Sequence, residues 1–347
     1  MRAVVLVGGE GTRMRPLTET TPKPLIPLVD RPGLDHVLDH LARHGVHEVV
    51  LSSPYLEATF HPFIRSRHGD PVITWIREEE PLGTGGAIVH AVRSVGGGLA
   101  TEPFFALNGD ILTDLDLTAM RAFHRARSAS VTIALHHVDD ARAFGLVERD
   151  GQDRVVAFRE KPSEPVPGDV NAGTYLIDPL VLEPWSADRQ ISIEREIFPA
   201  VIEAGHVVAG FPGDAYWIDL GTPEKYLRAH FDLLEGKVRG VSYPAPWVAA
   251  DADVDVRAHL GRWVAIGPGA RVGPDAQLDD TVALAGSSVG PAARVLRSIL
   301  GPGAQVGAGA TVVDCVLGAG AEVPDDVQLD GVKVPTDAVA GADNPAG

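Results

Sequence analysis

The sequence predicts an α/β protein with a Rossmann-like, doubly wound and mostly parallel sheet, followed by a left-handed parallel β-helix of hexapeptide repeats. Two observations support this fold class. Residues 4–177 alternate short apolar runs with helical patterns, which is typical of a parallel sheet with helices on both faces. Beyond residue 265, single aliphatic residues recur every five or six positions, and this period indicates a β-helix.

The predicted strands of the first domain are short apolar runs at 4–7, 46–52, 72–77, 104–107, 131–138, 154–160 and 174–177. A helix is expected between the first two strands, because Leu34, Val37, Leu38 and Leu41 fall on one helical face. The last helix of the domain is expected to begin at Thr222-Pro223, which supply an N-cap and a proline at the first helical position.

The second domain is predicted from its repeats. Steps of six or five residues separate the aliphatic positions Ile266, Val272, Leu278, Leu284, Val289, Val295, Leu300, Val306, Val312, Leu317, Val323 and Leu329. Each of these side chains is expected to point into a narrow prism and to stack on its equivalent one coil away. We therefore place the first domain at 1–240, the β-helix at 251–335 and a disordered tail at 336–347.

Bulk composition excludes several classes of partner. The 347 residues carry a formal net charge of −17, which argues against nucleic acids and anionic membranes as partners. Cys315 is the only cysteine, so an intrachain disulfide is impossible and a reducing compartment is suitable. No apolar run approaches transmembrane length, and no cleavage-site pattern follows the N-terminal run. We expect a cytoplasmic protein with neither nucleic acid nor membrane as partner.

The stretch VVLVGGEGTRMRPLTETTPKPLIP, residues 4–27, predicts a phosphate-binding loop. Its glycines let backbone N–H groups approach an anion closely, while Arg13 and Lys23 add positive charge. A P-loop would carry a lysine after its last glycine, where this chain has Thr12. A dinucleotide fingerprint would carry a third glycine where this chain has Met14, so a dehydrogenase is disfavoured.

This stretch resembles the signature of the sugar-1-phosphate nucleotidyltransferases, the nucleotide-sugar pyrophosphorylases. The resemblance starts at GGEGTRMRPLT and KPLIP and continues, in order, through EEPLGTGGA, NGD, FGLVE, EKP, NAGTYLI, SIEREIFP and YWIDLGTP. It covers the whole first domain, which is thereby expected to be catalytic. The appended β-helix is also similar to that of several members, including GDP-mannose pyrophosphorylases.

The resemblance implies a single displacement, in which a sugar-1-phosphate oxygen attacks the α-phosphorus of a nucleoside triphosphate and pyrophosphate leaves. Such chemistry requires two anions to be held in line and their charge to be neutralised. By resemblance, Arg13 holds the leaving phosphates and Lys23 neutralises the α-phosphate. Asp110 and Asp219 bind the cofactor Mg²⁺ and complete the expected catalytic set.

The resemblance also implies which residues bind the two substrates. The expected nucleotide-binding residues are Val7, Gly8, Gly9, Gly11, Thr12, Arg13, Gly83, Thr84 and Gly109. The expected sugar-phosphate-binding residues are Gly145, Glu160, Lys161 and Asn171.

The turn PLGTGGA is most similar to guanylyltransferases, and no glutamine stands where thymidylyltransferases read a pyrimidine. We therefore expect GTP and mannose-1-phosphate as substrates, with GDP-mannose and pyrophosphate as products. Another NTP remains open, as do other acceptors such as valienol-1-phosphate, a heptose-1-phosphate or, for an adenylyl- or thymidylyltransferase, glucose-1-phosphate. The orientation of one hydroxyl separates such acceptors, and the sequence does not contain that geometry.

Two functions from other classes are disfavoured. Hexapeptide repeats also occur in acyltransferases, but the only histidine beyond residue 240 is His259, which precedes the regular repeats. We therefore expect the β-helix to form a homo-oligomer instead. A non-catalytic, regulatory relative that binds nucleotide sugars would be expected to lose catalytic residues, and this chain retains them.

Two features have no role in this hypothesis. His36, His40 and His44 are four residues apart on one helical face, lack a metal-binding motif of the HExxH type, and are expected to face solvent. The acidic run EEEPL, residues 78–82, is unexpected beside a nucleotide and has no explanation in the sequence.

Overall fold

A computed structural model describes the chain at residues 1–54, 57–160 and 162–341. The chain divides into two compact units, which do not follow each other along the sequence. Unit 1 comprises Met1–Gly9 and His36–Trp217, and unit 2 comprises Glu10–Asp35 and Ile218–Gly347. The glycine-rich stretch is therefore split between the units directly after Gly9.

Unit 1 is built on one sheet, which has nine strands within the described residues. These strands are β1 (Arg2–Leu6), β4 (Glu48–Ser53), β5 (Val72–Arg77), β6 (Phe104–Asn108), β8 (Val131–Val138), β9 (Gly145–Arg149), β10 (Val155–Glu160), β11 (Gly168–Ile177) and β12 (Val208–Pro212). Strands β5, β4, β1 and β6 are parallel neighbours, as the alternating sequence pattern predicts. Strand β11 runs antiparallel to β6, β8 and β9, which makes the sheet mixed.

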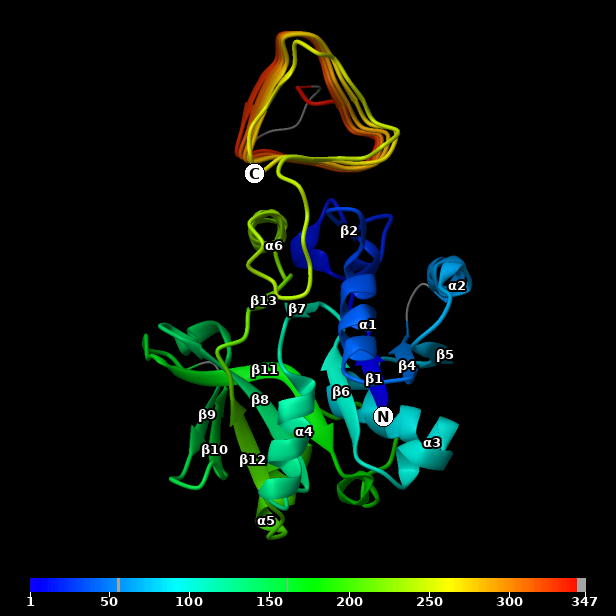
Figure 1. Cartoon of the computed structure of the whole chain (residues 1–347), viewed down its shortest axis with the longest axis vertical. Coiled ribbons are helices and arrows are strands. Elements are labelled where there is room, and N and C mark those ends of the chain that lie inside the picture. The colour runs from blue at the N-terminus through cyan, green and yellow to red at the C-terminus, as the bar shows by residue number, and fades with distance from the viewer. Residues whose placement is uncertain (55–56, 161, 342–347) are drawn as a thin grey trace. The chain divides into compact units, whose positions relative to one another are not determined.

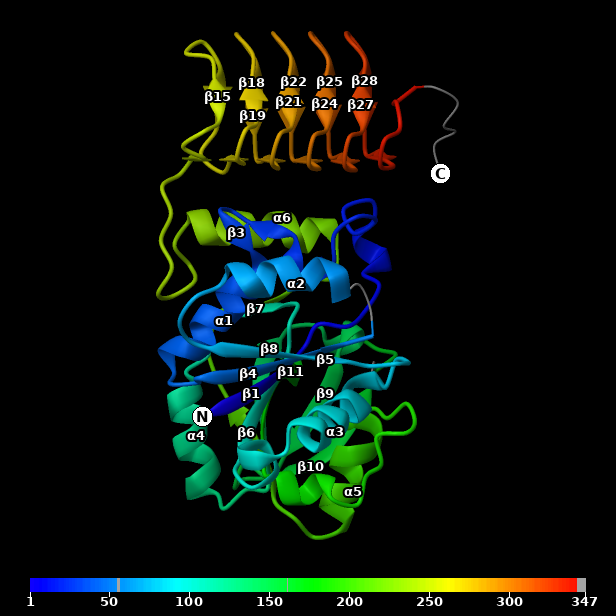
Figure 2. The ribbon, with the colours of Figure 1, turned by 90° about the vertical axis from the view of Figure 1, so that its right-hand side faces the viewer.

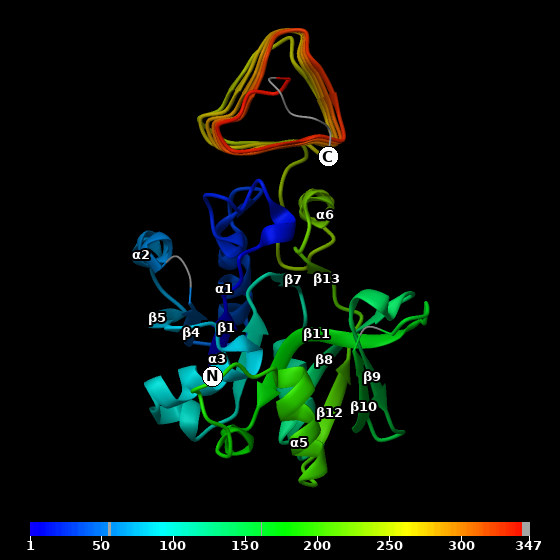
Figure 3. The same cartoon turned by 180° about the vertical axis from the view of Figure 1, so that it is seen from behind.

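The helices of the α/β pattern cover this sheet. They are α1 (Gly33–Arg43), which crosses from unit 2 into unit 1, α2 (Glu57–Ser66), α3 (Gly83–Val95), α4 (Leu117–Ala126) and α5 (Phe198–Glu203). Helix α3 packs on β1 and β4, α4 on β8 and β12, and α5 on β10 and β12. Figures 1 and 3 show α4 and α5 on opposite faces of the antiparallel part of the sheet. The predicted α/β class is thereby confirmed.

The core of unit 1 is formed by the buried strands and by large aromatic side chains. Phe104, Tyr175 and Phe198 are fully buried, and the rings of Tyr175 and Phe198 meet edge to face with centroids 5.2 Å apart. Burial of each such side chain contributes about 1.5–3 kcal/mol to folding. This packing fixes β11 and the segment before α5, two elements that contribute to the candidate site.

Unit 2 joins the second half of the glycine-rich stretch to α6 (Pro223–Leu234). The Thr222 side chain caps α6 by accepting a hydrogen bond from the Lys225 backbone, as its sequence position predicts. Strands β2 (Pro27–Leu28) and β3 (Arg31–Pro32) form a hairpin. Two buried side chains of α6 hold it: His230 Nε2 accepts from the Val29 backbone N–H at 3.1 Å, and the Tyr226 hydroxyl donates to the Pro27 carbonyl oxygen.

The rest of unit 2 is a parallel β-helix, as expected of the predicted left-handed hexapeptide class. Its strands form three sheets. The first contains β14 (Trp247–Val248), β17 (Ala265–Ile266), β20 (Val282–Ala283), β23 (Ile299–Leu300), β26 (Val316–Leu317) and β29 (Lys333–Val334). The second contains β15 (Asp253–Val254), β18 (Arg271–Val272), β21 (Ser288–Val289), β24 (Gln305–Val306) and β27 (Glu322–Val323). The third contains β16 (His259–Leu260), β19 (Gln277–Asp279), β22 (Arg294–Leu296), β25 (Thr311–Val313) and β28 (Gln328–Asp330).

Figure 1 looks along this prism, whose coils overlay as a triangle, and Figure 2 shows the same coils stacked side by side. Equivalent positions on neighbouring coils, such as Arg297 and Asp314, are 17 residues apart. The first coil has 18 residues, whereas the later coils have 17, one residue fewer than three hexads, which explains the recurrent five-residue step. The aliphatic stack is confirmed at Val272, Val289 and Val306, which are paired in register and buried. It is wrong at Leu284, because Ile266 pairs with Ala283, one residue earlier.

One face of the prism differs from the other two. In the sheet that contains β17, the outward residues Ala265, Val282, Ile299 and Val316 are apolar and buried. Helix α6 faces this sheet, and the rings of Phe231 and Trp263 lie 5.9 Å apart. Outward positions of the other two sheets are mostly polar, as at Arg271, Ser288, Gln305 and Glu322.

The C-terminal end continues the last coil over 336–341. There the backbone N–H groups of Asp337 and Ala340 donate to the carbonyl oxygens of Ala319 and Glu322. The remainder of the expected disordered tail, 342–347, lies outside the described residues. None of the helices in the described part of the chain has the length and apolar character needed to cross a bilayer.

The expectation that three histidines face solvent is wrong for two of them. His36 and His40 are only 3% and 4% exposed. They line the inner side of α1 beside Asn108, Thr113 and Thr174, where α1 packs against the sheet. The apolar face of this helix is therefore wider than its leucines and valine indicate.

Burial of His40 predicts a pH-dependent stability. Desolvation lowers the pKa of His40 from 6.5 to about 4, with smaller contributions from His44 and Arg43. The folded state thus binds this proton less well than the unfolded state does. Its stabilisation is complete above pH 6.5 and is lost as the pH falls toward 4. We expect His40 to account for about 2 kcal/mol of lost stability at pH 5, measured as the unfolding midpoint against pH.

The variant to test is His40→Leu, and its control is His68→Leu, which removes an exposed histidine. His40→Leu should flatten the profile between pH 5 and 7, and His68→Leu should not. An unchanged slope in His40→Leu would contradict the assignment.

Candidate active site

Unit 1 contains a cavity of about 820 Å³ beside α3, β9, β10 and β11. Such a volume lies within the range that small-molecule sites usually have. Four of the predicted site residues line it, namely Gly83, Thr84, Gly145 and Asn171. The structure thus brings together residues expected to bind the nucleotide and residues expected to bind the sugar phosphate.

Sequence reasoning missed the far wall of this cavity. Ser192 and Glu194 line it, and Glu194 lies in a π-helix at Ile193–Ile197. Both belong to the motif SIEREIFP, which supported the family resemblance but received no role. The motif itself was the signal that could have identified them.

The glycines of the turn before α3 are required by close packing. Gly83 has φ +68°, and a Cβ there would lie 2.7 Å from the Ile191 carbonyl oxygen. The backbone N–H groups of Gly85 and Gly86 donate to that same oxygen at 2.9 and 3.2 Å. The turn is therefore fixed against the segment that carries Ser192 and Glu194.

A chain of hydrogen bonds crosses the cavity wall. The Thr84 hydroxyl donates to Glu194 Oε2 at 3.0 Å, and the Tyr175 hydroxyl donates to Glu194 Oε1 at 3.1 Å. Asn171 Nδ2 in turn donates to the Tyr175 oxygen at 2.8 Å. One carboxylate therefore links a residue at the start of α3 to a residue in the middle of β11.

The predicted sugar-phosphate residues lie on adjoining strands. Gly145 and Glu160 are paired in register where β9 begins and β10 ends, and Asn171 lies on the neighbouring strand β11. Lys161 and the side chain of Glu160 lie outside the described part of the structure.

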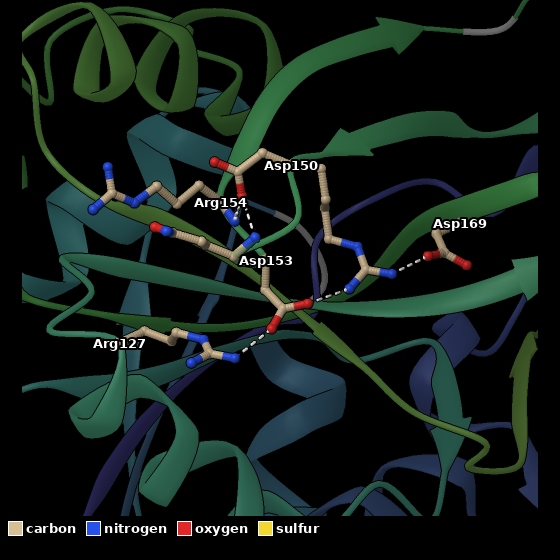
Figure 4. Close-up of polar contacts among 7 residues, drawn as sticks. Arg127, Asp150, Asp153, Arg154 and Asp169 are labelled. Carbon is tan, nitrogen blue, oxygen red and sulfur yellow. Dashed lines mark hydrogen bonds and ion pairs between the residues drawn. The ribbon is translucent and has the colours of Figure 1, made fainter.

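A network of ion pairs holds these strands in register (Figure 4). Arg149, at the end of β9, donates to Asp153 and to Asp169, which precedes Asn171 on β11 by two residues. Asp153 also accepts from Arg127, which follows α4. Burial opposes ionisation of Asp169, but its hydrogen bonds from His137 and Arg149 lower its pKa below the ordinary value. The carboxylate therefore stays ionised and paired at neutral pH.

Four of the expected nucleotide-binding residues lie together at the carboxyl end of β1. The Gly109 N–H donates to the Leu6 carbonyl oxygen at 2.8 Å. A Cβ at Gly109 would lie 2.9 Å from Val7 Cγ1, so this position requires glycine for the close approach of the β6 turn to β1. Gly8 and Gly9 follow directly, and a Cβ at Gly9 would meet no atom within 4 Å. Open backbone of this kind suits contact with phosphate oxygens.

Glu78 explains part of the acidic run. Its side chain is 4% exposed, whereas Glu79 and Glu80 are exposed. Glu78 Oε1 accepts from the Ser52 hydroxyl at 2.8 Å, and Oε2 accepts from the Leu82 N–H at 3.1 Å. The first acid of the run therefore fastens the loop before Gly83 to the end of β4.

We expect Glu78→Ala to lower the thermal unfolding midpoint by about 3–6 °C, because two buried donors would lose their acceptor. It should also weaken nucleotide binding, since the loop that leads to Gly83 would be released. Glu79→Ala, which removes the same charge from an exposed neighbour, should stay within about 1 °C of the parent. Equal effects of the two substitutions in calorimetry would contradict a specific role for Glu78.

Unit 2 carries the charged part of the candidate site. Lys23 Nζ lies 3.7 Å from Asp219 Oδ1, and Lys225 Nζ lies 3.5 Å from Asp219 Oδ2. A Cβ at Gly221 would lie 2.9 Å from Arg13 Nη2 and 3.0 Å from both Asp219 oxygens. Two ammonium groups therefore lie within 4 Å of one carboxylate, and the Arg13 guanidinium lies beside the same glycine. Such a gathering of cationic side chains is typical of a site for phosphates. The predicted Arg13, Lys23 and Asp219 are brought together here.

Gly11 supports this cluster through its backbone. It has φ +61°, and a Cβ there would lie 2.9 Å from Thr18 Cγ2 and 3.4 Å from Lys23 Cβ. Its carbonyl oxygen accepts from the Thr18 hydroxyl at 2.8 Å. Thr12 begins a 3₁₀ turn directly after it (Thr12–Met14). Glycine at this position thus lets the loop fold back onto the lysine.

The carboxylates of this chain suit a divalent cation whose other ligands come from phosphate and water. Among the described residues, no three or more histidines, cysteines, aspartates or glutamates lie close enough to hold a metal together. The expected ligands Asp110 and Asp219 belong to units 1 and 2 respectively. A cation held by one or two carboxylates, with phosphate oxygens and water completing its shell, is the arrangement that Mg²⁺ prefers. The donors present therefore suit a metal that arrives with a phosphate substrate.

Comparison with known proteins decides the family. A model described as nucleotidyl transferase matches residues 2–236, and one described as the GMPPB C-terminal domain matches residues 243–340. The chain belongs to the nucleotidyl transferase family. The matched ranges include every candidate residue described above in both units.

Relatives of known name are similar over most of their length. The mannose-1-phosphate guanylyltransferase of Mycobacterium tuberculosis is 40% identical over 299 residues, 82% of this chain and 80% of the relative. A probable mannose-1-phosphate guanylyltransferase 2 of Arabidopsis thaliana is 37% identical, over 77% of this chain and 75% of the relative. The crystal structure of HddC from Yersinia pseudotuberculosis complexed with GMP-PN shares 29% identity at a TM-score of 0.57, covering 66% of this chain and 97% of that one.

Proposed function

We propose that this member of the nucleotidyl transferase family transfers the guanylyl group of GTP to mannose-1-phosphate, forming GDP-mannose and pyrophosphate. The relatives from M. tuberculosis and A. thaliana, which are named for this reaction, support the choice of both substrates. The HddC complex with GMP-PN is in line with a guanine nucleotide. The observation that carries the transfer chemistry is that Lys23 lies 3.7 Å from Asp219, with Arg13 and Asp219 both next to Gly221.

In the proposed reaction, unit 2 handles the reacting phosphates. Lys23 is only 11% exposed, so its charge is screened weakly by water and acts strongly on a nearby phosphate. We assign it to the α-phosphate, where charge builds up during attack. The planar guanidinium of Arg13 can hold two oxygens of the leaving pyrophosphate. Gly11 and Thr12 would offer backbone N–H groups to the same phosphates, and we assign Gly8 and Gly9 of unit 1 to the nucleotide as well.

We assign the substrate base and sugar to unit 1. Gly83 and Thr84 would contact the base, together with Val7 and Gly109 at the end of β1. Gly145, Glu160 and Asn171 would hold sugar hydroxyls, and Lys161 would bind the sugar's phosphate. A site built of hydrogen-bonding groups rejects an epimer strongly, because a misplaced hydroxyl leaves polar groups unpaired.

We propose Mg²⁺ as the cofactor and assign its protein ligands to Asp110 and Asp219. When bound, the ion would neutralise phosphate charge and hold the phosphates in a reactive geometry. Asp219 also holds Lys23 and Lys225 within 4 Å. Its carboxylate therefore keeps both ammonium groups close to where the phosphates would bind.

Three further expectations remain proposals. They are domain boundaries at 1–240 and 251–335, a cytoplasmic location and a homo-oligomer that forms through the β-helix. The two matched ranges, 2–236 and 243–340, support the boundaries. For the oligomer, the two polar faces of the prism are the surfaces to examine, because α6 faces the apolar one.

The test is pyrophosphate release by the full chain with Mg²⁺. GTP, ATP, dTTP and UTP are each combined with mannose-1-phosphate, glucose-1-phosphate, a heptose-1-phosphate and valienol-1-phosphate. Turnover concentrated at GTP with mannose-1-phosphate is the expected result. Turnover at another pair would retain nucleotidyl transfer but overturn the proposed substrates. No turnover at any pair, with GDP-mannose still bound, would favour a regulatory protein.

A further inference from the structure

Glu194 is the end point of hydrogen bonds that converge from both sides of the cavity. It accepts from the hydroxyls of Thr84, Ser192 and Tyr175 at 3.0, 2.8 and 3.1 Å. We propose that Glu194 is a positioning residue that orients the Asn171 amide and the Thr84 hydroxyl together, and thereby couples selection of the sugar phosphate to binding of the nucleotide. This inference rests on the proposed function.

The direction of each hydrogen bond follows from groups that can act in only one way. The Gly173 backbone N–H donates to Asn171 Oδ1 at 2.9 Å, so the amide oxygen faces Gly173 and the amide nitrogen faces Tyr175. The Tyr175 oxygen must therefore accept from Asn171, and its single proton is left for another partner. An ionised carboxylate only accepts, and Glu194 takes that proton.

The same logic holds on the nucleotide side. The Ile193 backbone N–H donates to the Thr84 hydroxyl oxygen at 3.0 Å. The Thr84 proton is then available to Glu194 Oε2, which it contacts at 3.0 Å. One branch thus runs from a backbone N–H through Thr84, and the other from a backbone N–H through Asn171 and Tyr175, to the same acceptor, Glu194.

Because Glu194 fixes the orientation of the Asn171 amide through Tyr175, it affects which sugar phosphate the site selects. Asn171 lines the cavity, and with its orientation fixed from both sides it keeps one amide N–H and one oxygen lone pair for a ligand. A flipped amide would exchange donor for acceptor and would accept a different arrangement of hydroxyls. Loss of the carboxylate should therefore blur the discrimination between epimers and also loosen the start of α3.

Tyr175 can be used to test one branch, because its hydroxyl joins Asn171 to Glu194, whereas Thr84 donates to Glu194 directly. Tyr175→Phe keeps the buried ring and removes only the hydroxyl. We expect it to raise KM for the sugar phosphate about fivefold and to leave KM for the nucleotide within twofold. Glu194→Ala should raise both KM values, and the double variant should be no worse than Glu194→Ala toward the sugar phosphate.

The experiment measures both KM values and the ratio of kcat/KM for two epimeric sugar phosphates in these three variants. Glu203→Ala, an exposed acid at the end of α5, is the charge-matched control. Glu194→Gln provides a variant of the same size if Glu194→Ala does not fold. Its amide can accept from only one branch, so one KM should rise while the other changes less.

If the effects of Tyr175→Phe and Glu194→Ala on KM for the sugar phosphate added up in the double variant, the inference would be overturned. A change in kcat alone, with both KM values and the epimer ratio unchanged, would also overturn it. A general loss of stability lowers the active fraction for both substrates equally and cannot produce the expected split. The substrate pair used is whichever one the wild-type protein turns over. A failure of the proposed GTP and mannose-1-phosphate pair is therefore seen in the wild type, separately from any failure of the coupling.

Discussion

Lys23→Met is expected to lower kcat about 10²–10³-fold while KM for both substrates changes less than tenfold. The methionine keeps the length of the apolar stem and removes the ammonium group, which lies 3.7 Å from Asp219 on a side chain that is 11% exposed. A positive charge held beside the reacting phosphate stabilises the transition state more than the bound substrate, so its loss falls on kcat. Initial rates of pyrophosphate release, with both substrates varied, measure this.

Lys225→Met is the matched control for this prediction. Lys225 contacts the same carboxylate at 3.5 Å, but its side chain is 37% exposed. Water and salt screen an exposed charge, so we expect a fall of less than about fivefold. Similar losses in the two variants would contradict a specific role for Lys23 and indicate a general electrostatic effect.

Asp219→Asn is expected to lower kcat by a similar factor, about 10²–10³, and to shift activation by Mg²⁺ to concentrations at least tenfold higher. The amide has nearly the same shape but carries no charge, so it binds a hard cation less well. It also no longer attracts Lys23 and Lys225. The measurement is the rate of pyrophosphate release against Mg²⁺ concentration, after removal of metal with a chelator.

Asp214→Asn serves as its control, because Asp214 lies five positions earlier in the same segment and is exposed. It should leave both the rate and the Mg²⁺ dependence near those of the parent. If Asp219→Asn loses activity with an unchanged Mg²⁺ dependence, Asp219 supports the lysines but does not bind the metal.

Some of the candidate site could be predicted because its residues are close together in the sequence. The stretch from Gly8 to Lys23 combines glycines, cations and prolines within a few positions, and such a pattern has few other uses. The same holds for the β-helix, whose period is visible in the chain itself. Even its five-residue steps have a structural meaning, since they shorten every coil after the first to 17 residues.

Other features depend on contacts in the folded protein that the local sequence pattern does not predict. Glu78 is one of three adjacent glutamates, and only contact with Ser52 and Leu82 distinguishes it from the exposed Glu79 and Glu80. Nothing local predicts that it is buried. The burial of His36 and His40 was not predicted for the same reason, because burial depends on what packs against a helix.

The sequence by itself determined the α/β class, the repeat that builds the β-helix, the family and most of the residues expected to bind phosphate and sugar. Only the tertiary structure decided that β11 runs antiparallel, that Gly9 and Glu10 fall in different units, and that Glu194 joins Thr84 to Tyr175. Periodicity and motifs are properties of neighbouring residues, so they can be read along the chain. Strand direction, burial and hydrogen-bond polarity arise between residues as far apart as Thr84 and Glu194, and they exist only once folding has brought those residues together.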